Sequence, residues 1–329
     1  MYSVFKTLFN NLLKKIDLKI IRISTQFNTK QQSDFLFNLN RELLKILPQN
    51  DLVPEIVIFS MDRALQLHAL LGSILDNVSN TSTIHVLYRA STAEHAKAFE
   101  EVFLEFDKLN IYPITQKSKQ SFREQLIRIL ESIESEKMFF LVDDDLFIEK
   151  LDLKDLTQVY SPTTIFSLRM GENLEESYTT HRKQPKPEFK LINSNQSSQD
   201  DQISWSWNNS VLDWAYPLSV DGHLFSSKEI LAMSRCIDFD SPNTYENNLQ
   251  TFLPFFLNRS GLCFRKSRLV NIPCNKVQDY NNNRHGQIHQ NDLLEKWQKG
   301  EVIDFKKLYK TNNISAHQEL NLNFKSRLL

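Results

Sequence analysis

Between residues 51 and 142, short apolar runs alternate with stretches in which apolar residues recur every three or four positions. The runs are rich in β-branched and aromatic residues, as in strands buried on both faces. The longer spacing is typical of amphipathic helices. We expect strands at 55–60, 83–88, 110–115 and 137–142, and helices at 64–75, 91–106 and 121–133. This alternation predicts an open, mostly parallel sheet with helices on both faces, in which ligands bind at the carboxyl ends of strands.

Polar residues mark the starts of two of these helices. Ser91 and Glu94, and then Ser121 and Glu124, have the spacing of capping boxes, in which the two side chains bind free backbone N–H groups. Later starts are expected at Ser226, Asn243 and Asn291, and Gly300 is well placed to end the last helix.

The second half of the chain is less regular. Strands are expected at 163–170 and 268–272, whereas 178–204 is polar, carries prolines and is predicted to be a long loop. We expect one domain at 51–310, composed of the halves 51–150 and 151–310. A helical segment (1–50) precedes it, and a polar tail (311–329) with little core to bury follows it.

The N-terminal segment has a helical period. Its apolar residues fall on one side of a helix: Phe5, Leu8, Phe9, Leu12, Leu13, Ile16, Ile20 and Ile23. Residues 1–30 hold six basic residues and one acid, so their charge is 6 − 1 = +5. Lysines interrupt the apolar run, which is not typical of a signal peptide. The segment is either a helix lying on an anionic membrane surface or a helix packed on the domain or a partner.

Composition excludes several functions. Lys and Arg total 39 against 40 Asp and Glu, and a net charge of −1 argues against a nucleic-acid binder that neutralises phosphates over its surface. The six glycines form none of the glycine-rich phosphate loops. The three cysteines form no C-x-x-C pair, so we expect free thiols in a reducing compartment. No run of about 18 apolar residues predicts a spanning helix.

Asp143, Asp144 and Asp145 directly follow the apolar strand predicted at 137–142. Adjacent carboxylates repel one another, and a cation removes that cost. Mg²⁺ and Mn²⁺ prefer oxygen ligands and often link one or two carboxylates to substrate phosphates. Alternation along the chain would aim Asp143 and Asp145 together and Asp144 away. The alternative is a solvated acidic turn. Phe147 argues against a phosphatase of the D-x-D-x-[TV] kind.

With these features, the chain resembles the GT-A fold glycosyltransferases, in particular the family 2-like group, over residues 54–310. The matching segments are IVIFSMDRALQLHALLGSI (56–74), VLYRAS (86–91), the D-x-D segment FFLVDDDLF (139–147), SVDGHLF (219–225), SPNTYENNLQ (241–250) and NIPCNKVQDY (271–280). The resemblance implies a Rossmann-like central sheet. It also implies transfer of a sugar from a nucleotide-sugar donor, with UDP as the expected nucleotide, assisted by Mn²⁺ or Mg²⁺.

The same resemblance implies a glycan or lipid-linked acceptor, a role in bacterial surface polysaccharide synthesis, and a cytoplasmic active site, which the N-terminal helix would hold on the inner face of the membrane. The residues expected to contact the donor are Ser60, Asp62, Arg63, Tyr88, Ser91, Asp143 and Asp144. Those expected to bind the metal are Asp143, Asp145 and His285. A helix N-cap explains Asp62 equally well. Tyr88-Arg89-Ala90-Ser91 stands where typical members carry an acidic residue that contacts the base.

A hydroxyl acceptor must lose its proton in an inverting transfer, so a carboxylate is expected as general base. Asp221 and Glu246 are the candidates, because Glu246 stands where the family has an acidic residue at the start of an acceptor-side helix. A capping role explains Glu246 about as well, and a turn explains Asp221. For the acceptor sugar we expect one or two stacking rings among Trp205, Trp207, Trp214 and Tyr216, the others being core.

Two other functions compete with this interpretation. A nucleotidyltransferase uses a similar sheet and carboxylates, but normally has a loop rich in glycine and basic residues after the first strand, where this chain has SMDRALQ. The other is a catalytically silent scaffold that binds a glycan or a partner enzyme.

Overall fold

The computed structural model describes residues 34, 37, 38, 40, 41, 43, 50–118, 121–192, 201–274, 290–309 and 311–327. The helix predicted in residues 1–30 and the predicted metal ligand His285 lie outside the described residues. The described positions from 34 to 43 are helical and contact the main domain. Asn40 Nδ2 donates to Glu229 Oε1 at 2.5 Å, and Asn258 Nδ2 donates to Asp34 Oδ1 at 2.8 Å. No helix in the described part of the chain is both long and apolar enough to cross a bilayer.

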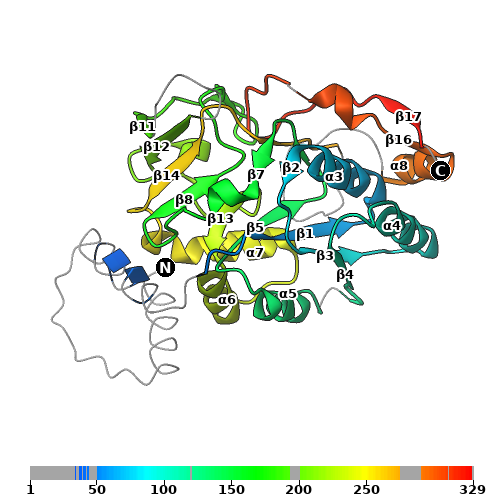
Figure 1. The fold of residues 1–329 in the computed structure, drawn as a ribbon, viewed down its shortest axis with the longest axis horizontal. Coiled ribbons are helices and arrows are strands. Elements are labelled where there is room, and N and C mark those ends of the chain that lie inside the picture. Colours follow the sequence, from blue (N-terminus) through cyan, green and yellow to red (C-terminus); the bar gives the residue numbers. More distant parts are fainter. Residues whose placement is uncertain are drawn as a thin grey trace.

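The described residues form a nine-stranded sheet in the order β11–β12–β14–β8–β13–β5–β1–β3–β4 (Figure 1). The strands are β1 (Glu55–Met61), β3 (Ile84–Arg89), β4 (Ile111–Thr115), β5 (Lys137–Val142), β8 (Thr164–Ser167), β11 (Lys190–Ile192), β12 (Gln202–Ser206), β13 (His223–Ser226) and β14 (Ser260–Phe264). Strands β12 and β13 run antiparallel to both neighbours, and the others share one direction. The predicted α/β fold with a mostly parallel central sheet is confirmed.

Alternate residues of β1 pack into opposite cores. Ile56 and Ile58 belong to one buried cluster, while Val57 and Phe59 belong to another. Because both faces are covered, the strand is a continuous apolar run. In Figure 1, one face carries α3 (Ala64–Asn77), α4 (Ala93–Glu105) and α8 (Gln290–Gln298), and the other carries α5 (Phe122–Ser132), α6 (Ser227–Cys236) and α7 (Pro242–Leu249).

The order of the first four parallel strands creates a switch point. Along β4–β3–β1–β5, the chain places its third, second, first and fourth parallel strands. The chain leaves β1 toward β3 on one side and returns on the other side with β5. In doubly wound sheets a ligand crevice opens at this reversal, outside the carboxyl ends of the strands. These ends are the segments after Met61 and Val142.

The region predicted as a loop at 178–204 contains strands, so that prediction is wrong. Arg182–Lys183 (β10) pairs with Glu176–Ser177 (β9), and β11 and β12 extend the main sheet. Residues 193–200 lie outside the described ones. The edge strand β11 gave no apolar signal because its first two residues are exposed and only Ile192 is half-buried.

Ser121 and Ser226 precede α5 and α6 as expected, although the capping box predicted at Ser121 does not form. The starts of α4, α7 and α8 differ from the predictions by one or two residues. The cap of α4 is Thr92 and not Ser91, and the Thr92 side chain accepts a hydrogen bond from the His95 N–H. The cap of α7 is Ser241, which forms a capping box with Thr244. Helix α8 begins at Gln290, so Asn291 lies inside it. Gly300 does follow its end, with φ +76°.

Two-stranded pairs complete the structure: β2 (Val78–Ser79) with β7 (Leu151–Asp152), β6 (Asp145–Phe147) with β15 (Leu269–Asn271), and β16 (Glu301–Ile303) with β17 (Phe324–Ser326). The 3₁₀-helices are Leu153–Leu156, Leu212–Ala215, Gln250–Phe255 and Phe305–Leu308. The segment after residue 311 is not the expected solvated tail, because Asn313 and Ala316 are fully buried and Ser315 is 3% exposed.

Candidate active site

Asp143 joins the ends of β1 and β5 at the switch point. Its backbone N–H donates to Phe59 O at 3.1 Å. Its carboxylate accepts from Ser60 Oγ at 2.8 Å and from the Met61 N–H at 3.3 Å. Burial raises the pKa of Asp143 to about 6, although the Arg63 charge opposes the rise. The first predicted donor residues, Ser60 and Asp143, are therefore in direct contact.

Arg63 supplies a positive charge beside these carboxylates. Its Nη1 donates to Asp143 Oδ1 at 2.9 Å and to Asp144 Oδ2 at 3.2 Å. Burial alone would lower the pKa of the Arg63 guanidinium, but the two carboxylates outweigh burial and hold the pKa above its ordinary value. The residue stands at the start of α3, so the turn from strand to helix delivers its side chain to the strand ends.

Asp145 has different partners. Its carboxylate accepts from the Val142 N–H at 2.9 Å and from Asn271 Nδ2 at 3.2 Å. The pairing of β6 with β15 places Asn271 directly opposite Asp145. Burial and the nearby Asp221 charge raise the pKa of Asp145 well above its usual value. Buried carboxylates that repel each other mark a place short of positive charge.

Asp144 links its two neighbours, which corrects the expectation that it would point away from them. Asp144 and Asp143 both accept from Arg63. Asp144 and Asp145 both accept from Asn271, whose Nδ2 lies 2.8 Å from Asp144 Oδ1. Asp143 and Asp145 were expected to act together, but their carboxylates are held by different hydrogen-bond donors. The reason is that Asp145 already begins β6 and follows its own pairing.

Among the described residues, no group of three or more His, Cys, Asp and Glu side chains is arranged to hold a metal ion. A magnesium-like ion does not require such a cage, because one or two carboxylates suffice when substrate phosphates and water complete its shell. Asp145 fits this role: it is a buried carboxylate beside a second, repelling carboxylate. Asp143 fits it less well, because Arg63 already neutralises it.

Asp221 extends the acidic region toward the second half of the domain. It precedes β13, which runs antiparallel to β5, and the Gly222 N–H donates to Phe140 O at 2.8 Å. Asp221 Oδ2 accepts from Arg169 Nη1 at 3.3 Å and from His317 Nε2 at 3.1 Å. Burial works to raise the pKa of Asp221, but His317 and Arg169 outweigh burial and hold it below its ordinary value. Asp221 is therefore a fixed negative charge.

Glu246 lies next to Asp221, in the second turn of α7. The capping alternative is excluded, because Ser241 and Thr244 form the capping box without it. Its Oε1 instead accepts from the Val220 N–H at 3.2 Å. Burial, followed by the repulsion of Asp221, raises the pKa of Glu246 to about 7. A general base is most effective when its pKa is close to the working pH.

Asn271, Arg169 and His317 are site residues that the sequence did not reveal. His317 reaches Asp221 from the segment predicted as a polar tail, and Arg169 follows β8. A late histidine was expected, but at His285, which lies outside the described residues. Sequence spacing carried no signal for His317, because 96 residues separate it from Asp221.

Three of the predicted donor residues lie at or near the ends of β1 and β3. Asp62 does not cap α3: its Oδ1 accepts from the Ser91 N–H at 2.7 Å, which ties the loop after β1 to the loop after β3. Asp62 adopts φ +56°, a left-handed conformation that Asp tolerates better than most residues. The ring of Tyr88 packs on Phe99, with centroids 4.8 Å apart, so Tyr88 has a packing role.

One or two of four rings were expected to stack on the acceptor sugar, and the three tryptophans among the four belong to the core. Trp205, Trp207 and Trp214 are 3%, 0% and 0% exposed and lie in edge-to-face contact, with centroids 4.6 and 4.9 Å apart. Tyr216 is half-buried and remains a candidate. Burial and the Glu246 charge raise its pKa above the ordinary value, so its hydroxyl is neutral.

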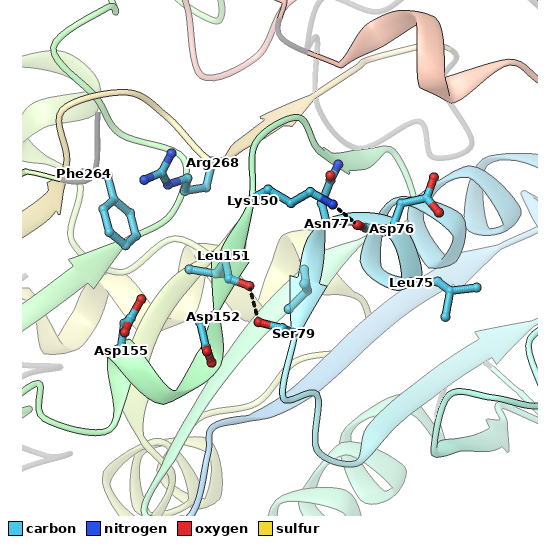
Figure 2. Close-up of a pocket in the computed structure, with 11 residues that line it drawn as sticks. Leu75, Asp76, Asn77, Ser79, Lys150, Leu151, Asp152, Asp155, Phe264 and Arg268 are labelled. Atoms are coloured by element: carbon cyan, nitrogen blue, oxygen red, sulfur yellow. Dashed lines mark hydrogen bonds between the residues drawn. The ribbon is translucent and has the colours of Figure 1, made fainter. Parts of the chain in front are cut away.

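One cavity lies away from these carboxylates. It measures about 370 Å³ and lies between the C-terminal end of α3 and β7 (Figure 2). Its charged groups are engaged with the protein: Lys150 donates to the Asp76 carbonyl, and Asp152 accepts from Asn80. Arg268 lies over the Phe264 ring, 4.2 Å from its centroid. A smaller cleft adjoins Asp143, Asp144 and Asp145 and is otherwise lined mostly by apolar residues.

The sequence matches no protein-family model and no curated protein. Among solved structures, S. aureus TarS is 15% identical, with a TM-score of 0.39, over 64% of this chain and 35% of that one. TarS 1–349 in complex with UDP is 14% identical, with a TM-score of 0.43, over 66% and 59%. UDP-glucose pyrophosphorylase complexed with UDP-glucose is 10% identical, with a TM-score of 0.33, over 65% and 90%.

The chain thus spans between about a third and three fifths of the TarS chains that it matches. None of these similarities reaches 25% identity or a TM-score of 0.5.

Proposed function

We propose that this protein is a glycosyltransferase that moves a sugar from a nucleotide-sugar donor to a hydroxyl group of a glycan or lipid-linked acceptor. The observation that carries the proposal is a set of electrostatically coupled acidic groups that begins at the carboxyl ends of β1 and β5 and extends to α7. Asp143 and Asp145 stand at the switch point, the charge of Asp221 acts on Asp145 and Glu246, and the pKa of Glu246 is raised to about 7.

The donor half of this site is the junction of β1 and β5. The donor diphosphate is negatively charged, and Arg63 is the cationic side chain at these strand ends. Because Asp143 and Asp144 already share the charge of Arg63, the diphosphate would also need a bound cation. Asp62 and Ser91 hold the two neighbouring loops together and so shape the place for the nucleoside. Since the chain lacks a glycine-rich phosphate loop, side chains held in fixed positions would have to bind the donor phosphates.

A divalent cation fits beside Asp145. Mn²⁺ or Mg²⁺ there would be held by Asp145, the donor phosphates and water, and would offset the negative charge that develops on the leaving diphosphate. The protein's own contribution is to hold Asp145 through the Val142 N–H and Asn271, so that its carboxylate stays oriented.

Glu246 is the general base in this proposal. Asp221 is held by Arg169 and His317 with a depressed pKa, so it is a weak proton acceptor. Glu246 has the higher pKa and therefore the greater proton affinity. It would take the proton of the acceptor hydroxyl as the new glycosidic bond forms and the bond between the sugar and the diphosphate breaks.

The first test is a thermal-stability screen of the full chain against nucleotide-sugars and UDP, with Mn²⁺ or with EDTA. A ligand that binds only the folded state, at 100 times its Kd, stabilises by about 2.7 kcal/mol. We expect one UDP-sugar to stabilise the protein in the presence of Mn²⁺, and the Asp145→Asn variant to lose that effect. Unchanged UDP stabilisation in Asp145→Asn would favour a silent binding scaffold.

The second test separates binding from chemistry. Glu246→Gln removes the base and leaves the donor half intact, so UDP stabilisation should persist while turnover falls about 10²- to 10⁴-fold. Turnover is measured as release of UDP from the stabilising UDP-sugar, with water or a glycan as acceptor. Equal turnover in Glu246→Gln and the native protein would exclude Glu246 as the base.

Two parts of the proposal concern the cellular setting. We propose that the protein acts in bacterial surface polysaccharide synthesis and that residues 1–30 hold it on the anionic inner face of the membrane. Sedimentation with vesicles containing phosphatidylglycerol, compared between the full chain and a form lacking residues 1–30, tests this. Equal pelleting of the two forms would remove the membrane role.

A further inference from the structure

The segment from residue 313 to 318 enters the candidate site and is tied to it by backbone hydrogen bonds. The Asn271 N–H donates to Ala316 O at 3.0 Å, and the Gln318 N–H donates to Asn271 O at 2.9 Å. The side chain of the same Asn271 holds Asp144 and Asp145. One residue thus connects the C-terminal segment to the acidic residues at the end of β5.

Further contacts seat this segment on the second half of the domain. The N–H groups of Glu175 and Glu176 both donate to Ile314 O, at 2.7 and 3.0 Å. Asn173 Nδ2 donates to Asn313 O at 2.6 Å. The segment is therefore built into the fold on both sides of residue 317.

His317 is the residue of this segment that reaches a charged group of the site. Its Nε2 lies 3.1 Å from Asp221 Oδ2, and the two side chains are 20% and 10% exposed. An ionised carboxylate only accepts hydrogen bonds, so Nε2 carries the proton. The other contact of this oxygen is Arg169 Nη1, at the longer distance of 3.3 Å.

We propose that His317 is a positioning residue for glycosyl transfer: its Nε2–H fixes the Asp221 carboxylate beside Glu246, so that the acceptor half is complete only with the C-terminal segment seated. This inference rests on the proposed function. It assigns a role to a segment that lies outside the six segments resembling a glycosyltransferase.

Physical arguments support a role in positioning. The charge of Asp221 acts on both Asp145 and Glu246. The other groups that act electrostatically on Glu246 or Asp221 are Arg169, Tyr216 and His223. Burial and Arg169 lower the pKa of His223 to about 3, so it stays neutral. A carboxylate held by two donors keeps one orientation, and a displacement of about 1 Å in a catalytic site costs roughly 10²-fold in rate.

The test compares His317→Gln with His317→Asn in the full-length protein. The amide nitrogen of Gln is as many bonds away from the backbone as Nε2 of His is, whereas the amide nitrogen of Asn is one bond closer to the backbone. We expect His317→Gln to keep kcat within about threefold of the native protein, and His317→Asn to lower kcat at least tenfold. Stabilisation by UDP with Mn²⁺ should be unchanged in both, because the donor half is intact.

The control is His181→Asn, an exposed histidine with φ +54°, a conformation that Asn tolerates. It should match the native protein in every assay. Melting temperatures measured without ligand show whether each variant is folded. If His317→Asn does not fold, the kcat of His317→Gln is compared with that of the native protein alone.

Three results would overturn the inference: equal kcat in His317→Asn and the native protein, equal loss in both His317 variants, or a loss of UDP stabilisation in His317→Asn as large as in Asp145→Asn. The last would make His317 part of the donor and metal site. A native protein that neither binds UDP nor releases it from any UDP-sugar would instead refute the proposed function.

Discussion

At the scale of single residues, Asp221 and Glu246 show how two neighbouring carboxylates acquire different properties. Asp221 is held by His317 and Arg169 and stays ionised. Glu246 accepts from one backbone N–H and faces the Asp221 charge, so its pKa rises to about 7. Pairs of acids whose environments separate their pKa values are typical of acid–base sites.

This arrangement predicts the pH dependence of turnover. Asp221→Asn removes a negative charge beside Glu246, so the pKa of Glu246 should fall and its ionised form should persist to lower pH. We expect the acidic limb of the log kcat profile to move to lower pH by about one unit. UDP release from the stabilising UDP-sugar, measured from pH 5 to 9, checks this.

The matched control for Asp221→Asn is Asp238→Asn, which alters a fully exposed acid and should leave the profile unchanged. An acidic limb that stays in place or moves to higher pH in Asp221→Asn would show that Asp221 does not raise the pKa of the catalytic base.

At the scale of elements, the cap of α7 decides where Glu246 points. Ser241 accepts from the Thr244 N–H, Thr244 accepts from the Ser241 N–H, and Pro242 occupies the first turn. Since the box is complete, Glu246 in the next turn is available for Val220. The sequence contains the same residues, but the prediction began the helix at Asn243, which left a capping role for Glu246 open as an alternative to the general base. Overlapping capping patterns cannot be separated without knowing which residue has the extended backbone.

We predict that Ser241→Ala lowers the free energy of unfolding by about 1 kcal/mol, the usual cost of losing an N-cap side chain. Urea denaturation followed by circular dichroism measures it. Ser226→Ala is the matched control, because Ser226 precedes α6 without a side-chain cap bond. It should change the free energy of unfolding by less than Ser241→Ala does, because no cap hydrogen bond is lost. Equal effects in the two variants would contradict the role of the cap.

At the scale of the whole molecule, the sheet continues beyond the strands of the first half of the domain, and this extension explains the tryptophans. Strand β12 pairs with β14, so that Trp205 lies opposite Gly261. The indole occupies the space that a side chain at residue 261 would need, because a Cβ there would lie 2.2 Å from Trp205 Cε2. The aromatic cluster is therefore a structural core of the second half.

Gly261→Ala should lower the free energy of unfolding by about 1–3 kcal/mol, the range for overpacking a core. UDP stabilisation should remain, because β14 is four strands away from β1. Gly300→Asn is the control: the space around Gly300 is open, and Asn tolerates the left-handed backbone that it adopts. A stable Gly261→Ala variant would mean that the indole has room to move.

The sequence by itself determined three features: the alternating strands and helices of the first half, the burial of β1 on both faces, and the cluster of carboxylates at residues 143–145. These properties depend on neighbours a few positions apart, so local spacing carries them. Tertiary structure decided which distant groups meet: Arg63 with Asp143 across 80 positions, Asn271 with Asp145 across 126, and His317 with Asp221 across 96. It also decided that the indoles are core and that the C-terminal segment belongs to the site. Strand order and pairing create these contacts, and periodicity within one segment does not specify which strands become neighbours.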